Sequence, residues 1–184
     1  MKTILISLEI DNHRRNYTMD HLKKYNLFDI YWLKGVNGAT DVKYYDITDS
    51  NGKTPVQKLI YNNKSRLYRT TIRRNQQLMS KGEIGCALSH LNVYEMLLKD
   101  SDNDRYLVFE DDGYISVSIE EFKDFMNNLP NSDSYDICHL YKSEWYPFLK
   151  DKNVNSHFCL LKKDTIQTYK DGIYHNYLNL VNCS

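Results

Sequence analysis

The sequence carries no excess of either charge, because 24 Lys and Arg balance 24 Asp and Glu over 184 residues. This balance removes the global electrostatic argument for nucleic-acid binding. No apolar run approaches the roughly 18 residues of a membrane span. The apolar run near the N-terminus is too short for a secretory signal, since Glu9 and Asp11 follow it. We therefore expect a cytoplasmic protein without a transmembrane segment or a nucleic-acid partner, which leaves peripheral membrane association open.

Cysteine is also scarce, and its spacing argues against a zinc site or a disulfide framework. The four cysteines are Cys86, Cys138, Cys159 and Cys183, with no C-x-x-C pair among them. The first three lie in apolar runs, where a free cysteine behaves as a small hydrophobe. The hydrophobic content of 41% and the charged content of 26% are ordinary for a globular protein. We expect a single domain over residues 1–184.

The first part of the chain has the pattern of a strand, a helix and a second strand. Residues 3–8 and 29–33 are short apolar runs typical of buried parallel strands. A helix is expected between them, over residues 16–25. Its expected inward positions are Tyr17, Leu22 and Tyr25. Residues 40–80 are polar and predict irregular structure, in which the basic stretch Lys64, Arg66, Arg69, Arg73 and Arg74 is expected to be a solvated face.

The rest of the chain continues the alternation of helices and strands. Residues 83–98 form the clearest helix, with Ile84, Ala87, Leu88, Leu91 and Leu98 on one face. A strand is expected at 106–109, and Ser118 with Glu121 predicts a capping box. The helix that it opens is expected to turn Phe122, Phe125, Met126 and Leu129 inward and to end at Pro130. Two more strands at 137–141 and 158–161, and a last helix after Asp164, complete a predicted α/β three-layer domain with a mainly parallel sheet.

Three consecutive carboxylates, Glu110, Asp111 and Asp112, directly follow the apolar strand at 106–109. Such anions repel one another, so a fold usually neutralises them with a cation. Alternate residues of an extended chain point the same way, which would place Glu110 and Asp112 on one face. Hard oxygen ligands suit Mg²⁺ or Mn²⁺, which bind substrate phosphates as further ligands. The alternative is a solvated acidic turn, and the triplet alone leaves both open.

Two competing patterns are weaker. Residues 100–104 match the start of an EF-hand loop, but Arg105 stands where the loop needs glycine, so a solvated loop is the better interpretation. Ser89 and His90 are adjacent on a helix and therefore point about 100° apart, and no G-x-S-x-G elbow exists, which argues against a catalytic triad. His90 remains a candidate ligand or hydrogen-bond donor, or equally a structural helix position.

The motif Gly82-Glu83-Ile84-Gly85-Cys86-Ala87-Leu88-Ser89-His90-Leu91, followed by a strand that ends in the acid triplet, resembles glycosyltransferase family 25. The similarity extends to the strand at residues 3–8 with Arg14 and Arg15 after it, to the glycine-containing turn at residues 36–39 and to the stretch 134–140. Together these segments span residues 3 to 140.

This resemblance implies a Rossmann-like fold of the GT-A type and a UDP-sugar donor, with galactose as the expected sugar. It implies that Mn²⁺ or Mg²⁺, held by Glu110 and Asp112, bridges the donor diphosphate. Arg14, Ser89, His90 and Asp111 are the expected donor-binding residues. The expected reaction is an inverting displacement by an acceptor hydroxyl, which needs a base, and Glu83, Asp136 and Glu144 are candidates by residue type alone.

The chain departs from the family pattern after about residue 158, where the expected small-residue helix and further acidic motif are not convincing. We therefore expect a domain that is shortened at its C-terminus. The main alternative to a galactosyltransferase is a degenerate relative that binds UDP or a protein partner without turnover. The acceptor is left open between a lipopolysaccharide sugar or other glycan and a hydroxylysine-type protein acceptor.

Overall fold

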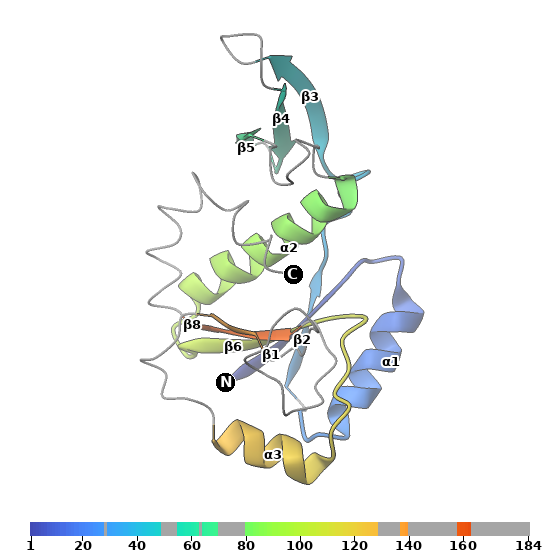
Figure 1. Cartoon of the computed structure of the whole chain (residues 1–184), viewed down its shortest axis with the longest axis vertical. Helices are drawn as coiled ribbons and strands as arrows, with labels where there is room; N and C mark the ends of the chain where they lie inside the picture. Colours follow the sequence, from blue (N-terminus) through green and yellow to red (C-terminus); the bar gives the residue numbers. More distant parts are fainter. Residues whose placement is uncertain are drawn as a thin grey trace. The chain divides into compact units, whose positions relative to one another are not determined.

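The computed structural model describes residues 1–27, 29–48, 55–62, 64–69, 80–128, 137–139 and 158–162. These residues divide into two compact units (Figure 1). The first unit contains Met1–Lys34 and the described residues from Asn92 onward, and the second contains Gly35–Leu91. The single domain expected over residues 1–184 stays a prediction, and each unit is described by itself.

The first unit is built on a five-stranded sheet in the order β2-β1-β6-β8-β7. Its strands are β1 (Lys2–Ser7), β2 (Ile30–Lys34), β6 (Arg105–Glu110), β7 (Ile137–His139) and β8 (Phe158–Lys162). β1 pairs in parallel with both β2 and β6, whereas β8 is antiparallel to β6 and to β7. Four of these five described strands therefore run in one direction, which confirms the mainly parallel α/β fold.

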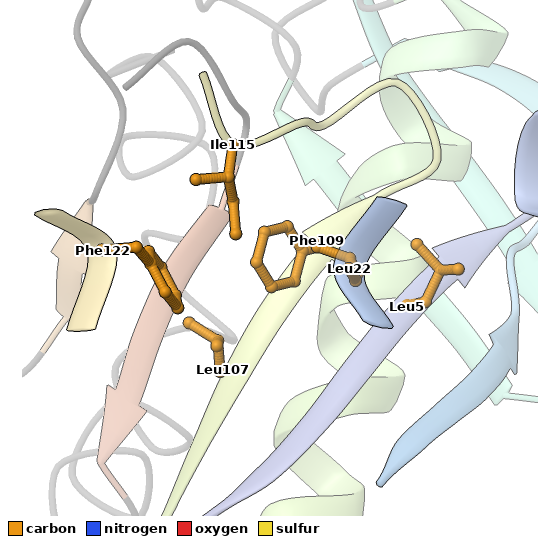
Figure 2. Packing of buried hydrophobic residues seen from close by; sticks show 6 residues of the cluster. All are labelled: Leu5, Leu22, Leu107, Phe109, Ile115 and Phe122. Carbon is orange, nitrogen blue, oxygen red and sulfur yellow. The ribbon is translucent and has the colours of Figure 1, made fainter. Parts of the chain in front are cut away.

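Helices cover both faces of this sheet (Figure 1). α1 (Asn12–Lys23) and α3 (Ile119–Asn127) cover the face that carries Leu5, Leu107 and Phe109. Figure 2 shows Leu22 of α1, Phe122 of α3 and Ile115 packed around these strand residues. The opposite face carries Ile4, Ile6, Tyr106 and Val108, which pack against Val93 and Leu97 of α2 (Lys81–Lys99). The strand residues are apolar on both faces because both are covered.

α1 differs from the sequence prediction in its start and in its inward face. It begins at Asn12, four residues earlier than expected, so Arg14 and Arg15 lie within the helix. Tyr17 was expected to be buried, which is wrong, because its side chain is 68% exposed. The buried positions are Arg15, Thr18 and Leu22. A helix that buries arginine and threonine through polar contacts does not show a clear apolar stripe in its sequence.

The other two helices agree with the sequence prediction, except that Leu91 and Leu98 of α2 are only partly buried while Val93 and Leu97 are buried. α2 buries Ile84, Ala87 and Leu88. α3 has the predicted capping box, in which Ser118 accepts from the Glu121 amide and the Glu121 carboxylate accepts from the Ser118 amide. Phe122 is buried, while Phe125 and Met126 pack against the core. Leu129, Pro130, Glu144 and the last helix expected after Asp164 lie outside the described residues.

The second unit contains a three-stranded antiparallel sheet where irregular structure was expected, so that prediction was wrong. Its strands are β3 (Lys43–Thr48), β4 (Pro55–Tyr61) and β5 (Lys64–Arg69), in that order. Leu59 of β4 is buried with Val36, Val42 and Leu88. An antiparallel sheet with one covered face needs apolar residues only at alternate positions, so a polar sequence can form one. Asn62 has a φ of 50°, which asparagine tolerates well at a tight turn.

None of the helices in the described parts of the chain combines the length and the apolar character that crossing a bilayer requires.

Candidate functional site

The acidic turn lies at the carboxyl end of β6, next to the end of β1. Ile6 of β1 pairs in register with Glu110, the last residue of β6. Ligands of open α/β sheets bind beyond the carboxyl ends of the parallel strands. The strand stops at Glu110, and the Gly113 amide donates to the Glu110 carbonyl at 2.9 Å to close a turn. Asp111 and Asp112 therefore lie in this turn, where the alternation of an extended strand no longer applies.

Asp111 is the buried member of the turn, with 10% of its side chain exposed. The Ser7 hydroxyl donates to one carboxylate oxygen at 2.7 Å, and an Arg14 nitrogen lies 2.6 Å from the other. Burial raises the pKa of Asp111 above its ordinary value, and the Ser7 hydrogen bond and the Arg14 charge act in the opposite direction. The carboxylate thus carries a desolvation cost that its two partners offset only in part.

Asp112 is the exposed member of the turn, with 54% of its side chain accessible. One of its oxygens lies 3.6 Å from the same Arg14 guanidinium, which is itself 50% exposed. Arg14 therefore contacts two neighbouring carboxylates and still presents part of its fork of donors to solvent. An exposed carboxylate beside an exposed guanidinium can contact a metal and an anion together.

The segment that leads into α1 is fixed by Arg15. Its guanidinium donates to the Leu8 carbonyl at 3.0 Å and to the Asn12 side chain. It also lies 3.8 Å from the centre of the Trp32 ring. Trp32 in turn donates from its indole nitrogen to the Ser7 carbonyl at 3.2 Å. These contacts hold the start of α1, and with it Arg14, against the ends of β1 and β2.

Glu83 and Ser89 have structural partners within the second unit. The Ser80 amide donates to the Glu83 carboxylate at 2.7 Å, and the Ser80 hydroxyl accepts from the Glu83 amide at 3.2 Å, which forms a capping box for α2. The buried Ser89 hydroxyl accepts from the Val36 amide at 2.8 Å and donates to the Gly85 carbonyl at 2.7 Å. Their predicted roles as base and donor ligand stay predictions.

The glycines of the motif allow the turn at residues 36–39 to approach α2. A Cβ on Gly85 would lie 2.5 Å from the Val36 carbonyl oxygen and 2.7 Å from the Gly38 nitrogen. A Cβ on Gly38 would lie 1.8 Å from the Lys81 carbonyl oxygen. Only glycine permits this approach of two backbones. His90 is partly buried further along the helix, and Asp136 lies outside the described residues.

The structure thus brings together three predicted residues, Arg14, Asp111 and Asp112, and adds two that the sequence analysis missed. Ser7 is the first of these, and Thr18, whose hydroxyl donates to the Asp111 carbonyl at 2.8 Å, is the second. Ser7 could have been identified from the sequence, since it is a polar residue at the end of an otherwise apolar strand. Thr18 could not have been identified in this way, because a threonine within a helix has no distinctive spacing.

The carboxylates of the turn fit a divalent cation by donor chemistry. Glu110, Asp111 and Asp112 supply only hard oxygen atoms, the type that Mg²⁺ and Mn²⁺ prefer. Asp112 is the most accessible of the three, whereas Asp111 is already engaged by Ser7 and Arg14.

A comparison with protein families identifies the family of this chain. The model of glycosyltransferase family 25, described as an LPS biosynthesis protein, matches residues 1–182. No curated protein matches this chain significantly. The match covers nearly the whole sequence, including both the glycine-serine motif of α2 and the acidic turn after β6. The chain therefore belongs to glycosyltransferase family 25.

Proposed function

We propose that this protein is a metal-dependent glycosyltransferase that moves a hexose, with galactose expected, from a UDP-sugar to an acceptor hydroxyl with inversion. The observation that carries the proposal is the arrangement of Arg14, Asp111 and Asp112 beyond the ends of β1 and β6. The guanidinium and the exposed carboxylate supply a cationic and an anionic contact at the edge of the sheet where such folds bind nucleotides.

Each residue of the turn has a distinct part in this proposal. Asp111 orients Arg14, because it is buried and lies 2.6 Å from the guanidinium. Arg14 offers its remaining donors to the donor diphosphate, which a planar guanidinium recognises well. Asp112 and Glu110 would hold Mn²⁺ or Mg²⁺. When bound, such an ion neutralises charge that develops on the departing UDP.

The displacement also requires a base for the acceptor. The acceptor oxygen forms a bond to the anomeric carbon while the bond from that carbon to the diphosphate oxygen breaks, and the hydroxyl proton passes to the base. Glu83, Asp136 and Glu144 remain the candidates. Glu83 would have to serve as base while its carboxylate accepts a hydrogen bond from the Ser80 amide at the start of α2.

The acceptor class follows from the family alone. A lipopolysaccharide sugar is the first acceptor to test, since the family is described as one of LPS biosynthesis. Other glycans and hydroxylysine-type protein acceptors come next. The predicted cytoplasmic location, with peripheral membrane association left open, stays a prediction.

The first experiment is a calorimetric titration of UDP and UDP-galactose in Mn²⁺ and then in EDTA. We expect binding that depends on the metal. Asp112→Ala should weaken Mn²⁺-dependent UDP binding by at least about 10-fold, because a direct ligand should matter no less than an outer-shell partner. Its free energy of unfolding should stay within about 0.5 kcal/mol of wild type, since the side chain is exposed. Asp20→Ala, an exposed change on α1, is the matched control.

Three outcomes separate the alternatives. Undiminished UDP binding by Asp112→Ala would refute the site. Binding of UDP without donor hydrolysis or transfer to any acceptor would favour the degenerate relative. Absence of UDP binding in both Mn²⁺ and EDTA would refute the nucleotide-sugar proposal.

A further inference from the structure

The acidic turn continues into a segment, residues 113–117, that α1 holds through one row of polar side chains. Thr18 donates to the Asp111 carbonyl. In the turn just after this helix, the Tyr25 hydroxyl lies 2.6 Å from the Val117 carbonyl oxygen and 3.1 Å from that of Ile115. Arg14, Thr18 and His21 follow one another at spacings of four and three residues, which places them in one row on one side of α1.

His21 is the member of this row whose contact depends on its charge. Its Nε2 atom lies 2.9 Å from the Ile115 nitrogen and 3.0 Å from the Ile115 carbonyl oxygen. The Ile115 amide can donate to Nε2 only when that atom carries a lone pair, which requires a neutral ring with its proton on Nδ1. A protonated ring can only donate, so the Ile115 amide would lose this acceptor, and Nε2 would instead donate to the Ile115 carbonyl oxygen 3.0 Å away, which Tyr25 also contacts.

The surroundings of His21 favour the neutral ring. Tyr25 and Tyr114 lie against it, with ring centroids 5.2 Å and 5.7 Å away. Among the described residues, these two tyrosines are the titratable groups against the ring, and Lys24 is the charged group that acts on it. Burial lowers the pKa of His21 below 6.5, donation from Nε2 to the Ile115 carbonyl opposes this because it favours the protonated ring, and the Lys24 charge lowers the pKa further.

We propose that His21 is a positioning residue that holds the acidic turn for metal and diphosphate binding only while its imidazole is neutral. This inference rests on the proposed function, since it concerns the control of the same site. His21 contacts neither Asp111 nor Asp112 in this structure. It acts through the Ile115 backbone, and the Ile115 side chain is itself anchored in the core (Figure 2).

The direction of the pH effect follows from the lowered pKa. The folded protein binds the proton less tightly than the unfolded chain, so the contribution of neutral His21 to stability is present above pH 6.5. That contribution is lost as the pH falls through the pKa of the folded state. Binding of Mn²⁺ and UDP should weaken over the same range.

The test compares wild type with His21→Gln and with the matched control His13→Gln, an exposed histidine of the same helix. Glutamine can accept the Ile115 amide with its oxygen and does not titrate. Mn²⁺-dependent UDP affinity is measured from pH 7.5 to pH 5.5 by calorimetry. Amide exchange at Ile115, corrected for the intrinsic rate, is measured without ligand. The ionisation of UDP itself changes with pH in the same way for all variants, so it cancels when their affinities are compared.

Wild type and His13→Gln should lose affinity on the order of fivefold more than His21→Gln between these pH values. Protection of the Ile115 amide should fall in parallel. Equal pH profiles for wild type and His21→Gln, with UDP still bound, would overturn the inference and leave the proposed function intact. A His21-dependent loss of amide protection in a protein that binds no UDP would refute the proposed function, and with it the role in ligand binding, while the structural contact would stand.

Discussion

The motif that identifies this chain has two halves, the segment at the start of α2 and the acidic turn after β6. They differ in whether their polar side chains are paired within the protein or left accessible to a ligand. In the half at the start of α2, the Ser89 hydroxyl is paired within the protein, since it accepts a hydrogen bond from the Val36 amide and donates one to the Gly85 carbonyl. In the half after β6, Asp111 is buried with a raised pKa, and Asp112 is exposed beside Arg14. The polar groups of the first half are therefore paired within the protein, whereas the second half is where we propose that ligand and metal bind.

This difference shows that one family motif can combine two kinds of constraint. Gly85 and Ser89 are required by the approach of one backbone to another. The buried carboxylate of Asp111 is tolerated by the fold at a cost, as is common for groups that serve a ligand. Mutations in the two halves should separate stability from binding.

The largest effect on stability is expected from Gly85→Ala. The new Cβ would lie 2.5 Å from the Val36 carbonyl oxygen, and both neighbours within 3 Å are backbone atoms that can move only with the turn. We expect a loss of about 1–3 kcal/mol in the free energy of unfolding, measured by urea denaturation. Gly82→Ala is the matched control, since its Cβ would meet only the Ser80 hydroxyl at 3.9 Å. Equal stabilities of the two variants would contradict the close approach.

A comparable or smaller loss is expected from Ser89→Ala. The buried Val36 amide would lose its acceptor, which costs about 1–3 kcal/mol, part of which water can recover if the turn relaxes. UDP affinity in Mn²⁺ should not change, and the exposed change Ser101→Ala should leave stability within about 0.5 kcal/mol of wild type. If Ser89→Ala weakened UDP binding without loss of stability, Ser89 would be the donor ligand that the sequence resemblance implies.

The smallest change in stability is expected from Asp111→Asn, and its sign should be opposite. Because burial raises the pKa of Asp111 above 3.8, the folded state binds this proton more tightly than the unfolded chain. The wild-type carboxylate therefore costs stability as the pH rises through that pKa. Stability of Asp111→Asn relative to wild type should increase from pH 3 to pH 6 in urea denaturation. A relative decrease over this range would show that Arg14 and Ser7 outweigh burial.

The sequence was sufficient to predict those strands and helices whose local pattern agrees with the fold. β1 and β6 are apolar runs that end in polar residues, and the Ser118–Glu121 box marks the start of α3 without reference to the rest of the chain. The sheet of β3 to β5 was missed because its polar alternation resembles that of an irregular segment. Tyr17 was misplaced because α1 buries Arg15 against Trp32 and Thr18 against the Asp111 carbonyl, and both partners lie outside the helix.

The sequence by itself determined the family and the location of the acid triplet after a buried strand, because a motif and an apolar run are local properties. The tertiary structure alone decided which carboxylate is buried and which is exposed. Ser7 is 104 residues from Asp111, and Arg14 is nearly as far, so no local pattern predicts their contacts. Burial and ion pairing depend on strands and helices that meet only in the folded chain. Burial and ion pairing, in turn, determine the charge of the site.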